Sequence, residues 1–395
     1  MTAYAQPAPV QGAVFTRPVR ALTALAVLGI GLVVWRFMVG LGQSTALNDG
    51  YPWGLWIAFD VVTGTSLACG GYALVLLVYV MNRGQYHPLV RAATVTSAFG
   101  YSIAGFSVVI DIGRPWLAWK LPLFWHWKLR SVLLEVALCI LTYTIVLWIE
   151  LAPAFLERAQ ASTIPWIRQL GRTWLPVLRR SLVWVAALGV LLPTMHQSGL
   201  GTLLLLSGPR LHPLWNTIML PLLFLTSCIA MGFGVVVLES ALSARLLGRR
   251  PEMEMLAGLG AVIRPVLHLY LGVRLVDLIV RKQINQLFAF DSYSVMSLIE
   301  FVLFFGALAL LREERQRRNL RTLFRAAMLM LLGGALYRFD VFLIAFQPGP
   351  QWTYFPSVTE ILVSTGLVAA EVVGYILLIK RFPILAGAPA AAPAS

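Results

Sequence analysis

Residues 220–238 read LPLLFLTSCIAMGFGVVVL, nineteen positions without one charged side chain. A helix needs about 20 apolar residues, rising 1.5 Å each, to cross the roughly 30 Å hydrocarbon core of a bilayer. The sequence contains ten segments of this kind, and we predict that each forms a transmembrane helix. They are 21–41, 52–81, 90–112, 131–150, 181–206, 213–239, 256–280, 293–311, 321–346 and 354–379.

The composition of the whole chain agrees with a polytopic membrane protein. Of 395 residues, 59% are hydrophobic and only 12% are charged, about half the fraction typical of a soluble domain. This composition excludes a disordered chain, a coiled coil and a disulfide scaffold. The three cysteines, Cys69, Cys139 and Cys228, lie inside apolar runs without metal-site spacing, so we expect buried, reduced thiols.

Lysine and arginine predict the orientation of this all-α bundle. With a cytoplasmic N-terminus, the cytoplasmic segments hold 19 basic residues and the external ones hold seven. The positive-inside rule therefore places both termini in the cytoplasm. We expect an N-terminal tail over 1–20 that is not a cleaved signal peptide, a helical domain over 21–380 and a flexible tail over 381–395. The longest connection is 151–180, and the fifth span is the one we expect to be broken, near Pro193.

The external segment 113–130, GRPWLAWKLPLFWHWKLR, departs from this charge pattern. It holds four basic residues and four of the thirteen tryptophans. One interpretation is an aromatic belt with cations that reach toward the lipid headgroups. The other is a docking ledge for an external partner.

Ionisable side chains inside spans are energetically costly and usually line a site or a path. In the predicted topology they form an outer group and an inner group. The outer group is Asp60, Asp111, Glu135, His196, Glu300 and Glu360; the inner group is Glu150, Glu239, Arg264 and His268. The outer acids and the histidine suit a site that binds and protonates a two-electron carrier such as a quinone.

Helical spacing predicts several pairs. Arg274 and Asp277 are three residues apart, and the spacing favours an ion pair between them. Glu360 and Glu371 are three turns apart on one face of a helix. They could be two steps of a proton path, or two acids that each pair with a neighbouring helix. A b-type haem would require two facing axial ligands, and only His196 and His268 remain as a candidate pair inside spans. We therefore expect no haem in this chain.

Six motifs in the first third of the chain are similar to those of a known family. They are NDGYPWGLWIAFD (48–60), ACGGYA (68–73), YHPLVR (86–91), VVIDIGRP (108–115), FWHW (124–127) and SVLLE (131–135). Together they resemble the HybB-type integral membrane subunits of hydrogenase-2-type nickel–iron hydrogenases. These subunits belong to the NrfD/polysulfide-reductase membrane-subunit superfamily. The resemblance covers essentially the whole chain.

The resemblance implies a haem-free anchor in the bacterial inner membrane that reduces menaquinone or ubiquinone. It implies an iron–sulfur ferredoxin-like subunit on the periplasmic face and, beyond it, the small and large nickel–iron hydrogenase subunits. Tyr101, Glu135, His196 and Glu239 match positions implicated in quinone and proton chemistry, and Asp60 falls where relatives place polar residues of the quinone pocket. The hypothesis gives Asp60 and His196 hydrogen bonds to the headgroup and places Tyr101 in the pocket lining. Glu135 delivers a proton, and Glu239 admits protons from the cytoplasm.

Three alternatives stay open from the sequence. The chain could serve another iron–sulfur or molybdenum oxidoreductase, or an alternative complex III, within the same superfamily. Intramembrane acids are also compatible with a secondary transporter. A purely structural anchor without a quinone site is the third. Copurifying subunits would separate the first and second alternatives from the hydrogenase interpretation.

Overall fold

The computed structural model describes residues 7–249 and 251–385, and within them the chain is helical without named strands. Ten helical spans are long and apolar enough to cross a membrane, which confirms the predicted fold class. The predicted tail lies outside the described residues from position 386 onward. The spans are α1 (Arg17–Val39), Trp56–Val80, Gly84–Asp111 with α5 (His87–Asp111), α6 (Val132–Gln160), α7 (Pro165–Leu205), α8 (Leu220–Leu247), α9 (Met253–Val280), α10 (Ser292–Leu310), Leu320–Ile344 with α12 (Leu320–Phe339), and α13 (Val358–Arg381).

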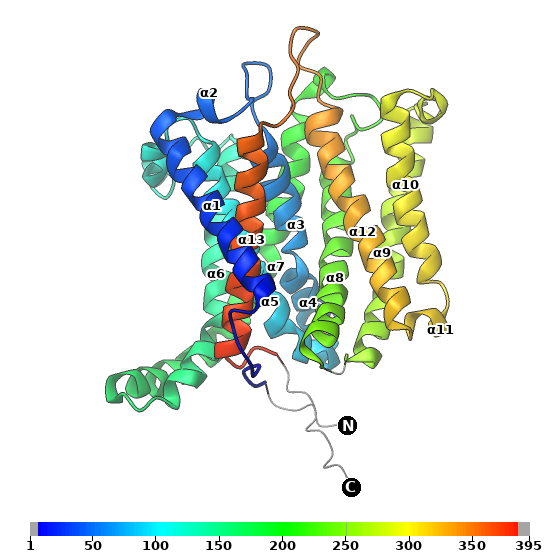
Figure 1. The fold of residues 1–395 in the computed structure, drawn as a ribbon. Coiled ribbons are helices and arrows are strands. Elements are labelled where there is room, and N and C mark those ends of the chain that lie inside the picture. Colours follow the sequence, from blue (N-terminus) through cyan, green and yellow to red (C-terminus); the bar gives the residue numbers. More distant parts are fainter. Residues whose placement is uncertain (1–6, 250, 386–395) are drawn as a thin grey trace.

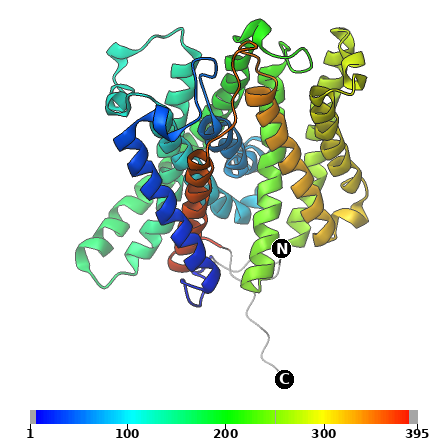
Figure 2. The ribbon, with the colours of Figure 1, turned by 45° about the horizontal axis from the view of Figure 1, so that its top comes forward.

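The spans run side by side in one bundle, and the described chain enters and leaves it at the same end (Figure 1). We call this the terminal end, and the opposite end the distal end. The second and sixth spans form the centre, because 83% and 78% of their most apolar stretches are buried, against 22% for α1. Tilting the view shows α1 and α13 on one side of these central helices and α9, α10 and α12 on the other (Figure 2).

The second span is not a continuous α-helix. It consists of a π-helix η1 (Trp56–Thr63), α3 (Gly64–Leu67), α4 (Gly70–Val75) and a second π-helical turn η2 (Leu76–Val80). A third π-helix, η8 (Asp340–Ile344), ends the ninth span. Wide turns of this kind are rare and occur frequently at functional sites. Two of them carry a buried carboxylate, Asp60 in η1 and Asp340 in η8.

Helices α6 and α7 form a hairpin that extends past the bundle at the terminal end (Figure 1). The 41 residues of α7 correspond to roughly 60 Å, about twice the hydrocarbon thickness. Two predictions were wrong here. The connection 151–180 is mostly helix, and the fifth span continues through Pro193. On either side of this point, Thr194 donates to the Val190 carbonyl and Ser198 to the Thr194 carbonyl, both at 2.7 Å.

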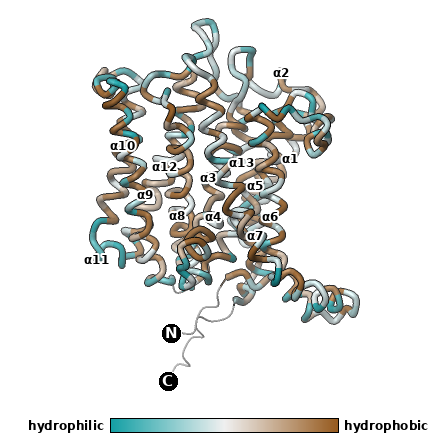
Figure 3. The backbone as a smooth tube through the Cα atoms, turned by 180° about the vertical axis from the view of Figure 1, so that it is seen from behind, coloured by the Kyte–Doolittle hydropathy of each residue, from teal (hydrophilic) through white to brown (hydrophobic). Residues whose placement is uncertain are grey.

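The hydropathy of the residues changes along the length of the bundle. Hydrophobic residues cover the middle of the spans, and hydrophilic ones gather on the connections at both ends (Figure 3). The first and last helices pack against each other, since a Cβ placed on Gly29 of α1 would lie 2.8 Å from Gly366 Cα of α13. Glycines at such crossings let helix backbones approach closely. The segment before α1 also follows the end of α13, with Val10 N bonded to the Ile379 carbonyl at 2.9 Å.

Candidate functional site

A cluster of buried polar side chains lies between α5, α7 and the second span. His196 and Gln197 of α7 are fully buried, and both reach Thr65 Oγ1, from His196 Nε2 at 3.2 Å and Gln197 Nε2 at 3.0 Å. Ser66 donates to Gln197 Oε1 at 2.9 Å. The Tyr101 ring of α5 meets the His196 imidazole edge-on, with centroids 5.6 Å apart. The structure therefore brings together two of the predicted site residues, Tyr101 and His196.

Arg338 of α12 adds a positive charge to this cluster. It is fully buried, and its guanidinium donates to Gln197 Oε1 at 3.3 Å, the Phe224 carbonyl at 3.1 Å and Ser227 Oγ at 3.1 Å. Within residues 7–249 and 251–385 no ion pair includes Arg338. A buried cation satisfied by neutral acceptors alone favours negative charge on any group that binds beside it.

Glu135 lies at the edge of this region. It sits in the first turn of α6, where the Ser131 hydroxyl caps the helix, and it is exposed. A Cβ added at Gly199 would lie 4.0 Å from Glu135 Oε1, and Gly199 is one turn from His196 on α7. An exposed acid thus lies beside Gly199, one turn from a buried histidine, at the α6–α7 contact.

Asp60 does not join the histidine cluster. It is 3% exposed and accepts a 2.7 Å hydrogen bond from Ser364 Oγ of α13, while its Oδ1 has no partner among the described residues. Asp60 therefore faces α13, on another side of the second span from Thr65 and His196. Its predicted bond to the same headgroup as His196 stays a prediction.

Glu239 lies near the terminal end, between α8, α5 and α13. It accepts hydrogen bonds from Tyr375 Oη of α13 and from Thr96 Oγ1 of α5, the latter at 3.3 Å. A small cavity of about 30 Å³ opens beside it, enough for about two water molecules. Its polar lining includes Ser240, Ser243, Arg249 and Glu252. The predicted entry residue is therefore next to a polar recess at the end that holds both termini.

Glu360 holds the backbone in place, because both of its carboxylate oxygens accept hydrogen bonds. Its Oε1 accepts from Tyr354 Oη at 2.5 Å, and its Oε2 accepts from the backbone amides of Ala46 and Ser357, both at 2.9 Å. With Ser357 it forms a capping box at the start of α13. Burial and the adjacent Glu360 carboxylate raise the pKa of Tyr354, so this phenol remains a donor. Glu360 anchors the distal connections.

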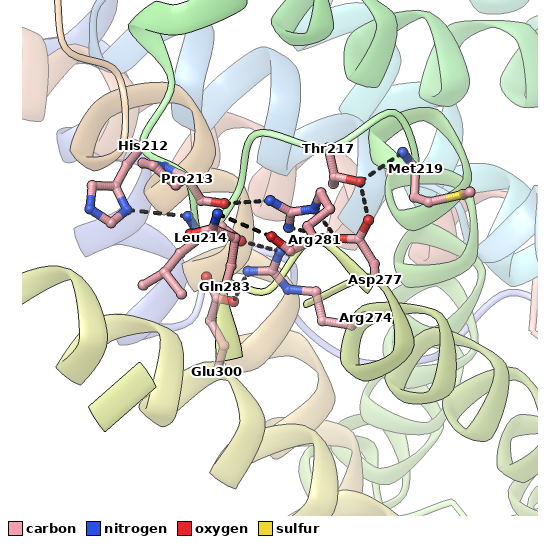
Figure 4. A network of polar contacts seen from close by, with 10 residues as sticks. All are labelled: His212, Pro213, Leu214, Thr217, Met219, Arg274, Asp277, Arg281, Gln283 and Glu300. Carbon is pink, nitrogen blue, oxygen red and sulfur yellow. Dashed lines mark hydrogen bonds and ion pairs between the residues drawn. The ribbon is translucent and has the colours of Figure 1, made fainter. Parts of the chain in front are cut away.

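A second polar network lies at the distal end between α9, α10 and the segment 211–219 (Figure 4). Arg274 pairs with Glu300 of α10 at 3.5 Å and donates to the Leu214 carbonyl at 2.7 Å. Asp277 pairs with Arg281 at 2.6 Å. The prediction of an Arg274–Asp277 ion pair was wrong, because Arg274 pairs with Glu300 on the neighbouring helix and Asp277 pairs with Arg281, the residue that follows α9.

The histidines do not form a haem site of two facing imidazoles. His87, His126 and His268 are exposed, and His212 stacks on Tyr293 in the distal connection with ring centroids 4.2 Å apart. His268 Nδ1 meets the Arg264 carbonyl of its own helix at 2.8 Å. His196 is thus the one buried histidine of the described chain.

The tryptophan-rich segment folds over the distal end as two short 3-10 turns, η4 (Pro115–Lys120) and η5 (Phe124–His126). Its aromatic rings are largely open, since Trp116, Trp119, Phe124 and Trp125 are 62–70% exposed. Both interpretations of this segment, lipid belt and docking ledge, predict outward rings.

Several contributors are not recognisable as site residues from the sequence. Thr65, Ser66 and Ser364 are ordinary hydroxyl residues within apolar runs, and Tyr375 looks like any aromatic residue of α13. Arg338 carries a signal, because a charge inside a span needs a partner. The neutral groups that bind it come from α7 and α8, which its position in the sequence does not indicate.

The chain is similar to membrane subunits of known redox enzymes. The sequence model described as "Polysulphide reductase, NrfD" matches residues 43–347. The chain is 43% identical over 385 residues to the "Probable Ni/Fe-hydrogenase 2 b-type cytochrome subunit" of Escherichia coli, covering 96% of this chain and 95% of that protein. It is 30% identical over 243 residues to "Menaquinone reductase, integral membrane subunit" of Nitratidesulfovibrio vulgaris, covering 60% of this chain and 56% of that one. Identity to "Protein NrfD" of Escherichia coli is 28% over 173 residues, 42% of this chain and 52% of that protein.

Proposed function

Because the chain belongs to the NrfD family, we propose that it is the quinone-reactive membrane subunit of a nickel–iron hydrogenase complex. The full-length similarity to a subunit named for hydrogenase 2 supports the choice of hydrogenase. The similarity to a subunit named for menaquinone reductase supports the choice of substrate. Hydrogen chemistry then takes place on partner subunits, and electrons reach this chain through an iron–sulfur subunit.

The observation that carries the quinone site is the proximity of Glu135 to the His196 cluster. A quinone arrives through the lipid and needs a donor for each carbonyl and one proton for each electron. In this proposal the headgroup enters at the α6–α7 surface, His196 and Tyr101 orient it, and Glu135 delivers a proton. Arg338 stabilises negative charge as electrons arrive, because no carboxylate neutralises it within the described chain. Reduction consumes two electrons and two protons per quinone.

We propose that the chain works without haem of its own, although its E. coli relative is named a b-type cytochrome subunit. A bis-histidine haem does not fit the described residues, because only His196 is buried and its Nε2 is at Thr65. We assign the distal end to the periplasmic side and the terminal end to the cytoplasm, following the basic residues. The exposed aromatics of η4 and η5 are then the docking ledge for the iron–sulfur subunit. Glu239, at the terminal end, admits protons.

The experiment is purification of the complex from its native membrane, with identification of the subunits and assay of hydrogen oxidation. We expect nickel–iron and iron–sulfur partners, no haem stoichiometric with this chain, and hydrogen-dependent reduction of a short-chain quinone. Glu135→Gln should slow quinone reduction while leaving hydrogen-dependent reduction of a soluble viologen dye unchanged. Molybdenum-enzyme partners would move the assignment to another oxidoreductase of the family. A chain that purifies alone and intact would favour a transporter.

A further inference from the structure

We propose that α13 carries a proton path, running from Glu239 at the terminal end through Tyr375 and Glu371 to Asp60. This inference rests on the proposed function, because the path supplies protons that quinone reduction consumes. It deepens that function by naming the residues between the entry and the bundle centre. The family match ends at residue 347, so the path uses a helix that lies beyond it.

The polar residues of α13 form a single column. Ser364, Glu371 and Tyr375 lie seven and four residues apart, which places them within about 40° of one another around the helix axis. The column from Ser364 to Tyr375 is roughly 16 Å long, about half the hydrocarbon thickness. α13 packs on α5 and on η1, which carries Asp60. Glu371 and Tyr375 are neighbours one turn apart on this face.

At the terminal end, the column is joined to the recess beside Glu239. Tyr375 Oη donates to Glu239 Oε1, and Thr96 Oγ1 donates to Glu239 Oε2 at 3.3 Å. Ser240 and Glu252, in the lining of the same recess, are bonded to each other at 3.0 Å. A proton taken up at the recess therefore meets a carboxylate that is already hydrogen-bonded to the first hydroxyl of α13.

At the other end, the column reaches an acid that has an unused acceptor. Ser364 Oγ satisfies Asp60 Oδ2, and Asp60 Oδ1 is buried without a partner in the part of the chain that the structure describes. Glu371 lies on the same face of α13 as Ser364, the residue bonded to Asp60, two turns or roughly 10 Å further along the helix. Its Oε1 also lies over Gly100 of α5, where an added Cβ would be 3.6 Å away. Glu371 thus stands between Tyr375 and Asp60.

Glu371 has no structural task of the kind that Glu360 has. Glu360 uses both oxygens to hold backbone amides and a tyrosine, and it forms no ion pair within the described residues. Glu371 accepts no hydrogen bond within those residues, although it is largely enclosed between helices. A costly acid without a structural partner, between two polar groups of one column, is typical of a relay. In this proposal Asp60, which the hypothesis from the sequence bonds to the quinone headgroup, passes one of the two protons to it, and Glu135 delivers the other. One proton enters at Glu239 for each proton that leaves Asp60, so the path has no net change after each transfer.

The experiment uses the intact complex reconstituted in proteoliposomes, with hydrogen as donor. Two rates are compared, the reduction of a short-chain menaquinone analogue in the bilayer and the reduction of a soluble viologen dye that bypasses the quinone. We expect Glu371→Gln and Tyr375→Phe to slow quinone reduction by about 100-fold or more, since a positioned proton-transfer group typically contributes about 10²- to 10⁴-fold, and to leave the dye rate unchanged. Glu371→Asp should restore much of the quinone rate.

Matched controls are available on exposed sites of the same chain. Glu314→Gln removes a carboxylate that is paired with Arg318 on the surface, and Tyr79→Phe removes a half-exposed phenol. Both should keep wild-type rates. Wild-type quinone reduction in Glu371→Gln and Tyr375→Phe would overturn the path, as would a Glu371→Asp variant as slow as Glu371→Gln. A wild-type complex that reduces the dye but no quinone would instead refute the proposed function itself.

Discussion

Replacing Arg274 tests how the distal network stabilises the bundle. The side chains of Arg274 and Glu300 are 1% and 3% exposed, so their ion pair is shielded from water. Among the residues that the structure describes, Arg274→Met leaves the buried Glu300 with the Trp215 indole as its remaining hydrogen-bond donor, at 2.9 Å. Removing one partner of a buried ion pair costs about 3–5 kcal/mol of unfolding free energy, mostly because the remaining charge is stranded.

The double variant Arg274→Met/Glu300→Gln separates this stranded charge from the other losses. The amide keeps an acceptor for Trp215, so the remaining cost is the unmade hydrogen bonds of the Leu214 carbonyl and of the new amide NH₂, about 1–3 kcal/mol. We therefore expect the double variant to be about 2 kcal/mol more stable than Arg274→Met alone. Equilibrium unfolding in detergent, followed by tryptophan fluorescence, measures the difference. The reasoning is refuted if the double variant is no more stable than the single one.

A surface ion pair provides the control for this experiment. Arg318 and Glu314 approach more closely than Arg274 and Glu300, at 2.8 Å, but their side chains are 68% and 67% exposed. Exposed pairs of this spacing contribute only about 0.3–0.5 kcal/mol. Arg318→Gln should therefore be nearly neutral, which would show that burial and not distance sets the cost.

Three further predictions concern the site and the packing. Glu135→Gln and Glu239→Gln should each slow hydrogen-dependent quinone reduction in assembled complexes, and wild-type rates in both would rule out their proton roles. Gly29→Ala should destabilise the α1–α13 contact by about 1–3 kcal/mol, because its Cβ would meet the Gly366 backbone, whereas Gly31→Ala has open space and should be neutral or stabilising in thermal unfolding. Leu214 N donates to His212 Nδ1 at 3.3 Å, and burial lowers the pKa of His212 below its usual 6.5, partly opposed by Asp291. The neutral ring therefore stabilises the folded state fully at pH values above the unfolded-state pKa of His212, and this stability is lost as the pH falls through the folded-state pKa. Hydrogen exchange in residues 211–217 should therefore accelerate in acid. His212→Gln should remove that pH dependence.

The sequence was sufficient for the helical spans, because apolar length alone decides which segments can cross a membrane. All ten segments were predicted, with differences of a few residues at most ends. It was not sufficient where a helix continues past its apolar run. The 151–180 region, which contains five arginines, was predicted as a connection between two spans, yet α6 and α7 extend through it as a helical hairpin.

The sequence also could not predict which side chains on different helices interact with each other. Arg274 and Asp277 satisfy the spacing rule for neighbours on one helix, but Glu300 of α10 lies closer to the arginine in space. Asp60 was grouped with His196 by depth, and the structure instead directs it to Ser364, 304 positions along the chain. Depth in the membrane can be estimated from sequence position, whereas the direction in which a side chain faces depends on the rotation of each helix.

The contact between the first and last spans has a consequence for how the chain is made. α1 ends at Val39, and its partner α13 begins at Val358. At about 5–20 residues per second, roughly 15–65 seconds of synthesis separate the two helices. During that time α1 waits in the lipid without the helix that covers Gly29, and a chain that stops before α13 never completes the contact. The packing of α1 against α13 is therefore a late event in the assembly of the bundle, and it depends on the last helix being made.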